Sequence, residues 1–166
     1  TILGDTAIAV NPKDERYSHL SGQYAVVPFM DRRIPIIFDE FVDPDFGSGA
    51  VKVTPAHDPN DYEMGQRHGL ELINIMHTDG SLNSNAGPYE GLDRLVARPQ
   101  IVNDLESMGL VVRIEQYVHS VGHGSRSGAV IEPMLSDQWF INTRPMADKA
   151  ARAVRSGEIT FHPPRF

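Results

Sequence analysis

GSGAVKVTPAHDPNDY, residues 47–62, joins a glycine-rich turn, a short β-like run and the start of a helix. Val51 and Val53 alternate with Lys52 and Thr54 in the β-like run. Successive side chains of a strand point to opposite faces, so we expect the valines in the core and the two polar residues together on the other face. The segment therefore predicts a strand that presents a cation and a hydroxyl just before a helix begins.

The second half of this segment carries the signals of a helix N-terminus. Asp58 suits the N-cap, Pro59 the first helical position and Asp61 the third, near the positive end of the helix dipole. The helix is predicted to end near Gly69. One interpretation is that both acids only cap the helix and that His57 is a surface side chain. The other is a ligand site, because a cation, a hydroxyl and two carboxylates meet at one strand-to-helix junction.

Outside this segment, strand and helix patterns alternate irregularly along the chain. An irregular mixture favours an α+β fold, for which we expect a strongly curved, barrel-like sheet with peripheral helices. The four apolar residues at 101, 102, 105 and 108 have helical spacing, and Pro99 is expected to delay or kink that helix. A helical turn is predicted at 14–19 and a further helix at 143–157. Strands are predicted at 7–10, 23–29, 34–38, 72–76, 110–117, 129–134, 138–141 and 159–161.

Composition is that of one packed domain, which we expect to span residues 1–166. The 166 residues are 40% hydrophobic, enough for a sizeable core. The absence of cysteine excludes disulfides, cysteine-based zinc sites and cysteine nucleophiles. His119 and His123 on a glycine-rich loop are weak ligands by themselves, so we expect no metal. No apolar run approaches the length of a membrane span, so no membrane association is expected.

The net charge of −7 weighs against a nucleic-acid-binding face made by the chain as a whole. Proteins that bind nucleic acids usually carry excess positive charge on at least one surface. A local basic patch remains one interpretation of the arginines, and scattered solubilising charges are the other. The arginines in question are those at positions 32, 33, 144, 152 and 155.

Four blocks of sequence together resemble one known family. The chain is similar, over nearly its whole length, to the inserted editing domain (connective polypeptide 1) of the class I valyl-tRNA synthetases. The isoleucyl and leucyl enzymes carry related domains, and the lysine-bearing motif is most like the valyl version. The blocks are GDTAIAVNPKDERY at 4–17, GSGAVKVTPAHDPNDYEMGQRHGL at 47–70, GLDRLVAR at 91–98 and IEPMLSDQWF at 131–140.

The resemblance implies hydrolytic editing of threonine that has been wrongly attached to tRNA(Val), or of threonyl-adenylate. Valyl-tRNA synthetases are the established example of the need for it, since a hydrophobic pocket rejects the added hydroxyl of threonine only about a hundredfold. A polar editing pocket can demand that hydroxyl, because valine would leave buried polar groups unpaired. The implied reaction is attack of water on the ester that joins threonine to the terminal ribose.

The resemblance also implies roles for individual residues. The implied catalytic set is Lys52, Thr54, Asp58 and Asp61. Asp61 would bind the α-ammonium of the amino acid, Lys52 would stabilise charge on the ester carbonyl, and the other two would orient water or substrate hydroxyls. The implied substrate-binding set is Asp61, Phe46, Thr1 and His57, with Phe46 packed against the terminal adenosine and Thr1 as the last threonine of a threonine-rich segment.

The implied partners are the acceptor end of tRNA(Val), misactivated threonine and the rest of the synthetase chain. The resemblance implies no cofactor in this domain, whereas the full enzyme would use ATP and magnesium as a cytoplasmic monomer. Three alternatives stay open. The chain could bind the aminoacylated tRNA end without hydrolysis, could be a structural insert that has lost editing, or could be the equivalent domain of isoleucyl-tRNA synthetase.

Overall fold

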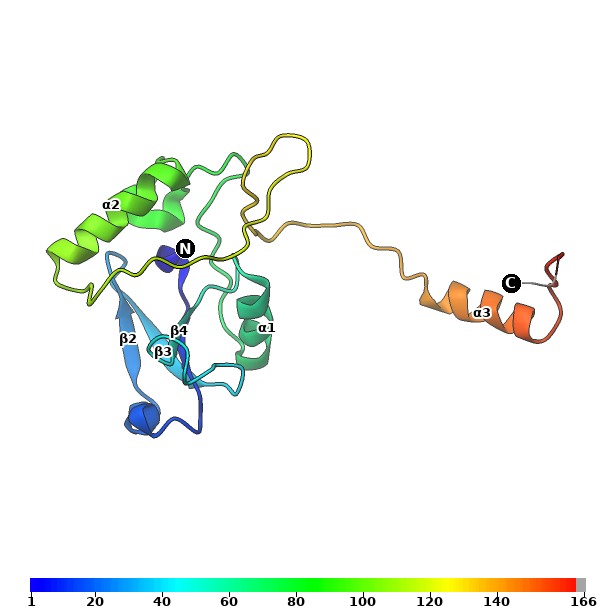
Figure 1. The fold of residues 1–166 in the computed structure, drawn as a ribbon, viewed down its shortest axis with the longest axis horizontal. Coiled ribbons are helices and arrows are strands. Elements are labelled where there is room, and N and C mark those ends of the chain that lie inside the picture. The colour runs from blue at the N-terminus through cyan, green and yellow to red at the C-terminus, as the bar shows by residue number, and fades with distance from the viewer. Residues whose placement is uncertain (164–166) are drawn as a thin grey trace. The chain divides into compact units, whose positions relative to one another are not determined.

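A computed structural model describes residues 1–163 of the chain (Figure 1). The chain forms two compact units, Thr1–Leu135 and Ser136–Phe166. The first unit holds all four strands and two of the three α-helices, and the second holds α3 (Arg144–Arg155). The expectation of one domain over residues 1–166 stays a prediction.

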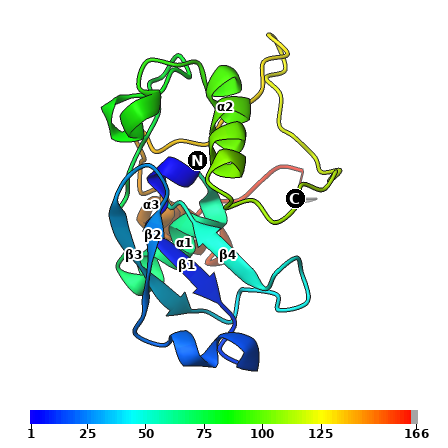
Figure 2. The same cartoon turned by 90° about the vertical axis from the view of Figure 1, so that its left-hand side faces the viewer.

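The first unit is built on a mixed four-stranded sheet in the order β2-β3-β1-β4. In the centre, β1 (Ala7–Val10) pairs in parallel with β3 (Arg32–Phe38) and antiparallel with β4 (Ala50–Val53). β2 (Tyr24–Val27) pairs antiparallel with β3. The α+β class is confirmed, but the barrel-like closure is not supported. Within residues 1–163, β2 and β4 have no further strand beside them, so the sheet is open (Figure 2).

Burial along the strands follows their place in the sheet. Ala7 and Ala9 of the central strand β1 are fully buried, and Val53 of β4 is fully buried as well. The prediction that Val51 would join the core was wrong, because its side chain is 38% exposed. Val53 belongs to the buried cluster with Met64 of the following helix, whereas Val51 does not.

Local signals placed the helix α1 (Pro59–His68) correctly. Asp58 caps its N-terminus, Pro59 is in its first turn, and Gly69 ends it in the left-handed conformation with φ of 64°. The helix α2 (Arg94–Ser107) begins earlier than predicted, because the Asp93 side chain caps it by accepting from the Leu95 backbone N–H. Pro99 lies inside α2. The short 3-10 helices are η1 (Ile2–Gly4), η2 (Glu15–Leu20) and η3 (Ser84–Tyr89). η2 agrees with the helical turn predicted at 14–19.

The strands predicted at 72–76, 110–117, 129–134, 138–141 and 159–161 were wrong. An apolar, β-branched pattern favours extended backbone, but a strand also needs a neighbour to complete its hydrogen-bond ladder. In these segments pairing is limited to isolated bridges, Met76 with Leu82 and His123 with Val130.

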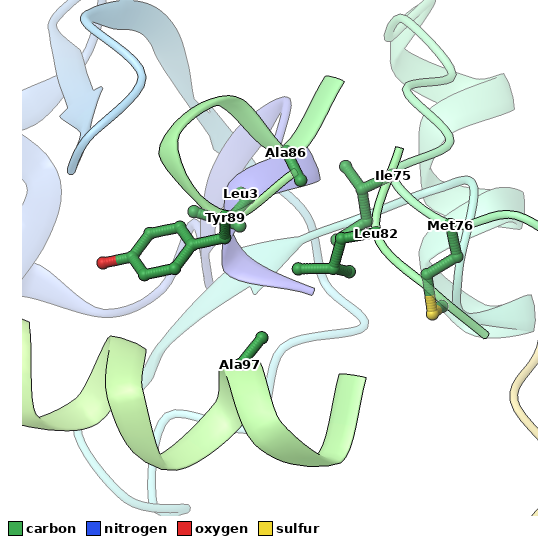
Figure 3. Packing of buried hydrophobic residues seen from close by; sticks show 7 residues of the cluster. All are labelled: Leu3, Ile75, Met76, Leu82, Ala86, Tyr89 and Ala97. Carbon is green, nitrogen blue, oxygen red and sulfur yellow. The ribbon is translucent and has the colours of Figure 1, made fainter. Parts of the chain in front are cut away.

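Two hydrophobic clusters fill the first unit, and residues 4–6 connect one to the other. The first lies under α2 and is drawn in Figure 3: Leu3, Ile75, Met76, Leu82, Ala86, Tyr89 and Ala97. The second lies between the sheet and α1: Ala7, Ala9, Val42, Val53 and Met64. The chain enters the sheet between the two clusters, and that crossing point holds the polar groups described next.

The second unit contributes no buried side chain from α3. Its apolar residues before that helix, Trp139, Phe140 and Ile141, are exposed. None of the helices within residues 1–163 has the length and apolar character that a bilayer crossing requires.

Candidate functional site

A chain of three polar side chains links β4 to the segment before β1. The Nζ atom of Lys52 donates to Oγ1 of Thr54 at 2.6 Å. Thr54 Oγ1 in turn donates to Oδ1 of Asp5 at 2.5 Å, and Lys52 Nζ lies 3.4 Å from that same carboxylate oxygen. The expectation that Lys52 and Thr54 share one face of the strand is confirmed. Thr54 is nevertheless buried, at 1% exposure, and its hydroxyl is enclosed between a cation and an acid.

The two acids of α1 join this group through backbone amides. Asp61 Oδ2 accepts from the backbone N–H of Thr54 at 2.8 Å. Asp58 Oδ1 accepts from the backbone N–H groups of Asn60 and Asp61, at 2.8 and 3.1 Å. Thr54 therefore connects Lys52, through its side chain, to Asp61, through its amide. Asp58 serves as the cap that the sequence predicted and sets the position of Asp61.

Burial has the largest effect on the pKa values of Asp5 and Asp61. Burial raises the pKa of the Asp5 carboxyl above its usual range, against the opposing charge of Lys52 and the hydrogen bond from Thr54. Burial also raises the pKa of Asp61, helped by the nearby charge of Asp58 and opposed by the Thr54 amide and Lys52. Both acids lie within electrostatic reach of the same ammonium, which favours their ionised forms.

His57 is not a surface side chain, so that interpretation of the sequence was wrong. Only 5% of the residue is exposed. Its Nε2 accepts from the backbone N–H of Ile75 at 3.0 Å, and its Nδ1 lies 3.1 Å from the carbonyl oxygen of Pro133. An amide can only donate and a carbonyl only accept, so the proton is on Nδ1. Burial lowers the pKa of His57, which keeps the ring neutral in this role.

A hollow of about 480 Å³ opens beside this group, between the start of the chain and α2. Lys52 and Thr1 line it together, as do the cationic side chains of Arg94 and Arg98 and the acid Glu132. Arg94 is held by Glu132, with Nε 3.0 Å from Oε1. The remaining wall is apolar and comes mostly from α2 and residues 75–76. Volume, apolar walls and a few charged groups are typical of a small-molecule site.

The predicted site residues do not all open onto one hollow. Asp58 lines a separate depression of about 350 Å³ beside Pro133 and Leu135. Phe46 is exposed and contacts Tyr117, with ring centroids 6.0 Å apart at an interplanar angle of 73°. The structure brings Lys52, Thr54, Asp58 and Asp61 into one hydrogen-bonded group and places Thr1 on the same hollow as Lys52.

Three residues of this site were missed by the sequence analysis: Asp5, Arg94 and Glu132. Asp5 lies in a G-D-T tripeptide directly before an apolar strand, and a buried acid there was the available signal. Its approach to Thr54 depends on the pairing of β1 with β4, in which the Thr6 backbone N–H donates to the Val53 carbonyl oxygen at 2.9 Å. That pairing joins residues almost fifty positions apart and has no local sequence signal.

The other chemical expectations concern metals and basic surface. Within residues 1–163, no three His, Asp or Glu side chains lie close enough together to hold a metal ion.

The five arginines considered for a basic patch divide between the two units. Arg32 is engaged inside the first unit, where Nη2 donates to the carbonyl oxygens of Leu3 and Asp5 at 2.6 and 3.0 Å. Arg33 covers the ring of Tyr24, at 4.8 Å from its centroid.

Comparison with known proteins places this geometry in a family. The family model described as "Leucyl-tRNA synthetase, editing domain" matches residues 5–118, which include every strand, α1, α2 and the Asp5–Thr54–Lys52 group. The chain belongs to this editing-domain family. Curated relatives at high identity are valine–tRNA ligases, and each is matched over the whole of this chain. The identities are 56% for Geobacillus stearothermophilus, 55% for Thermotoga maritima and 53% for Bacillus subtilis.

The editing domain spans about a fifth of the length of these relatives, 19% in each case. The resemblance to the valyl editing domain that the four sequence blocks indicated is confirmed by these matches.

Proposed function

We propose that this editing domain hydrolyses threonine from mischarged tRNA(Val) as part of a valyl-tRNA synthetase. The observation that carries the proposal is the ammonium of Lys52 on the wall of a hollow of about 480 Å³, held there by Thr54. The similarity to valine–tRNA ligases over the whole chain supports the valyl rather than the isoleucyl assignment.

The reaction needs a polarised ester and a positioned water. Water forms a bond to the carbonyl carbon, the bond from that carbon to the ribose oxygen breaks, and the ribose oxygen takes up a proton. Free threonine and deacylated tRNA leave. Lys52 stabilises the negative charge that develops on the carbonyl oxygen, as fixed donors do for acyl transfer in general. An ester is already reactive towards water, so positioning and charge stabilisation supply the catalysis without a dedicated general base.

The acids of α1 have recognition roles in this proposal. Asp61 does not line the hollow itself. It uses one oxygen for the Thr54 amide, and its other oxygen is assigned to the α-ammonium of the substrate. Asp58 keeps α1 and Asp61 in place and orients water or a substrate hydroxyl. His57 supports the site by joining Ile75 to Pro133, since both of its ring nitrogens have backbone partners. Thr1 contributes to the wall of the hollow, and Phe46 packs against the terminal adenosine.

The partners follow from this assignment. The acceptor end of tRNA(Val) enters the hollow, misactivated threonine is the amino acid removed, and the rest of a cytoplasmic, monomeric synthetase supplies the other tRNA contacts. Arg98 lines the hollow beside the ion-paired Arg94 and Glu132, and its positive charge suits a phosphate of a tRNA end. ATP and magnesium belong to amino-acid activation in the rest of the enzyme.

Release of free threonine from threonyl-tRNA(Val), compared with release of valine from valyl-tRNA(Val), tests the proposal. We expect rapid release of threonine and little release of valine. Asp61→Ala should abolish the activity while the protein stays folded. Asp58→Ser keeps a helix cap because serine also caps well, so a loss of activity in that variant reports on the Asp58 carboxylate rather than on the cap. Binding of threonyl-tRNA without any release would instead support the non-hydrolytic binding module. An empty hollow after exposure to a non-hydrolysable threonyl-adenosine analogue would support a purely structural insert.

A further inference from the structure

Asp5 contacts Lys52 of β4 and Thr54, the residue that follows this strand. We propose that Asp5 is a positioning residue of the editing site, whose carboxylate fixes the Thr54 hydroxyl and, through it, the Lys52 ammonium on the wall of the hollow. This inference rests on the proposed function for its catalytic consequence. Its structural consequence, a fixed Lys52, can be measured without any hydrolysis.

The direction of the hydrogen bonds makes Asp5 the final acceptor in the series Lys52–Thr54–Asp5. A threonine hydroxyl has one proton and two lone pairs, and an ionised carboxylate can only accept. Thr54 Oγ1 must therefore give its single proton to Asp5 Oδ1, 2.5 Å away, and offer a lone pair to Lys52 Nζ, 2.6 Å away. With that proton committed, Thr54 serves to hold Lys52 rather than to donate to substrate.

The backbone of Asp5 is held independently of its carboxylate. Arg32 Nη2 donates to the carbonyl oxygen of Asp5 at 3.0 Å, and the next residue, Thr6, donates to Val53 at 2.9 Å. A side chain at Gly4 would meet the carbonyl oxygen of Ile73 at 2.9 Å, so the preceding turn is closely packed as well. Replacing the carboxylate alone should therefore leave the segment in place.

The stability of the fold does not require a charge at Asp5. Burial raises the pKa of its carboxyl in spite of Lys52, which means that ionising it is less favourable in the folded protein than in the unfolded chain. An asparagine of the same shape would avoid that cost, but its neutral amide oxygen would accept more weakly from Thr54 and would not attract the Lys52 ammonium. A charge at this position is explained by what it does to Thr54 and Lys52.

Asp5→Asn in the full-length protein separates positioning from folding. We expect kcat for threonyl-tRNA deacylation to fall about 100-fold with KM within about threefold, because a small misplacement of a catalytic group has effects of that size. Asp39→Asn is the matched control, since Asp39 is a buried, ion-paired acid of the same sheet that does not line the hollow. It should leave kcat of the folded fraction unchanged.

A double variant tests whether Asp5 acts through Thr54. Residues that act as one unit give non-additive losses, so Asp5→Asn with Thr54→Val should lose no more activity than the worse single variant. An unchanged kcat in folded Asp5→Asn, or fully additive losses in the double variant, would overturn the inference.

Chemical reactivity of Lys52 tests the inference even if no threonine is released by the unmodified protein. In Asp5→Asn, acetic anhydride should acetylate Lys52 at least about threefold faster, because the amine is no longer held against Thr54 and Asp5 and is more accessible to the reagent. Lys13, paired with Glu40 at 3.3 Å, should react at an unchanged rate. Unaltered Lys52 reactivity would overturn the inference, whereas inactivity of the unmodified protein would overturn the proposed function alone. If Asp5→Asn does not fold, Thr54→Val should raise Lys52 reactivity in the same way.

Discussion

Asp5 and Asp39 are buried carboxyls at the two ends of β1, and their surroundings differ. Asp5 precedes the strand, while the Asp39 backbone N–H donates to Val10 at its far end, at 2.9 Å. Burial acts to raise the pKa of both. At Asp39 the Phe41 amide, His68 and Arg67 outweigh burial and hold the pKa below its usual range. At Asp5 the charge of Lys52 and the hydrogen bond from Thr54 do not outweigh burial, so the pKa of Asp5 lies above its usual range.

This difference in pKa distinguishes Asp39, which stabilises the fold, from Asp5, which positions Lys52. Asp39 Oδ2 lies 2.9 Å from both Arg67 Nη2 and His68 Nε2, so it ties β3 to the end of α1. Asp5 instead orients a lysine that lines a hollow. The charge of Asp39 is fully compensated, as is expected at a structural site. The charge of Asp5 is incompletely compensated, as is expected at a functional site.

We expect the largest effect on deacylation activity. Lys52→Gln removes the charge that is proposed to stabilise the ester oxygen, and kcat for deacylation should fall about 100- to 1000-fold. The thermal midpoint should change little, because the Lys52 side chain is 42% exposed. The measurement is single-turnover release of threonine, with thermal unfolding of the same sample. Activity within threefold of the unmodified protein would remove Lys52, and with it Asp5, from the site.

The next effect concerns stability at the other end of β1. Asp39→Asn should lower the free energy of unfolding by about 2 kcal/mol, since it weakens hydrogen bonds to charged groups. Asp5→Asn should change it by less than about 1 kcal/mol, because the burial cost of the carboxylate is removed together with its contacts. Urea unfolding of both variants measures the contrast. Equal losses in the two variants would mean that both acids are structural.

Asp104 is a third carboxylate, and its partner, the hydroxyl of Tyr89, is neutral. The Tyr89 hydroxyl donates to Asp104 Oδ2 at 2.7 Å, and burial together with this bond raises the pKa of Tyr89 to about 12 from its ordinary 10.0. Tyr89→Phe should cost about 1.5 kcal/mol at neutral pH. In the unmodified protein the unfolded state loses its tyrosine proton first, so stability should decline as pH rises from about 10 through about 12. The phenylalanine variant should lack that part of the decline in alkaline urea titrations.

The smallest effect is a difference in acid sensitivity. A lowered pKa at Asp39 supplies stability that is present above the unfolded pKa and is lost as pH falls through the folded pKa. A raised pKa at Asp5 does the opposite, and its contribution is lost as pH rises through the folded pKa. Between pH 3 and pH 7, Asp39→Asn should flatten the rise of the free energy of unfolding with pH and Asp5→Asn should steepen it, each by less than about 1 kcal/mol. If both variants changed the pH dependence of stability in the same direction, the opposite pKa shifts of Asp5 and Asp39 would be contradicted.

Sequence reasoning succeeded where the signal was local. The cap at Asp58, the end of α1 at Gly69 and the shared face of Lys52 and Thr54 each depend on residues within a few positions of one another. These are the features that propensity and periodicity describe. The composition of the candidate site within one strand-turn-helix segment was predicted for the same reason.

Sequence reasoning failed where distant segments meet. Asp5 approaches Thr54 only because β1 pairs with β4, and His57 is buried only because Ile75 and Pro133 supply its partners. The barrel-like closure failed because the apolar segments at 110–117 and 129–134 have no strand ladder within residues 1–163. Alternating apolar residues predict extended backbone, but not which neighbour completes the sheet.

The position of Lys52 on an edge strand has a consequence for handling the protein in solution. The outer backbone groups of an edge strand can recruit a strand from another copy, and a lysine there opposes such aggregation. β4 is a four-residue edge strand with Lys52 inside it, so the ammonium also keeps this side of the sheet from joining itself to a neighbour. An apolar replacement such as Lys52→Leu is therefore expected to scatter light more strongly with rising concentration, whereas the polar Lys52→Gln is not.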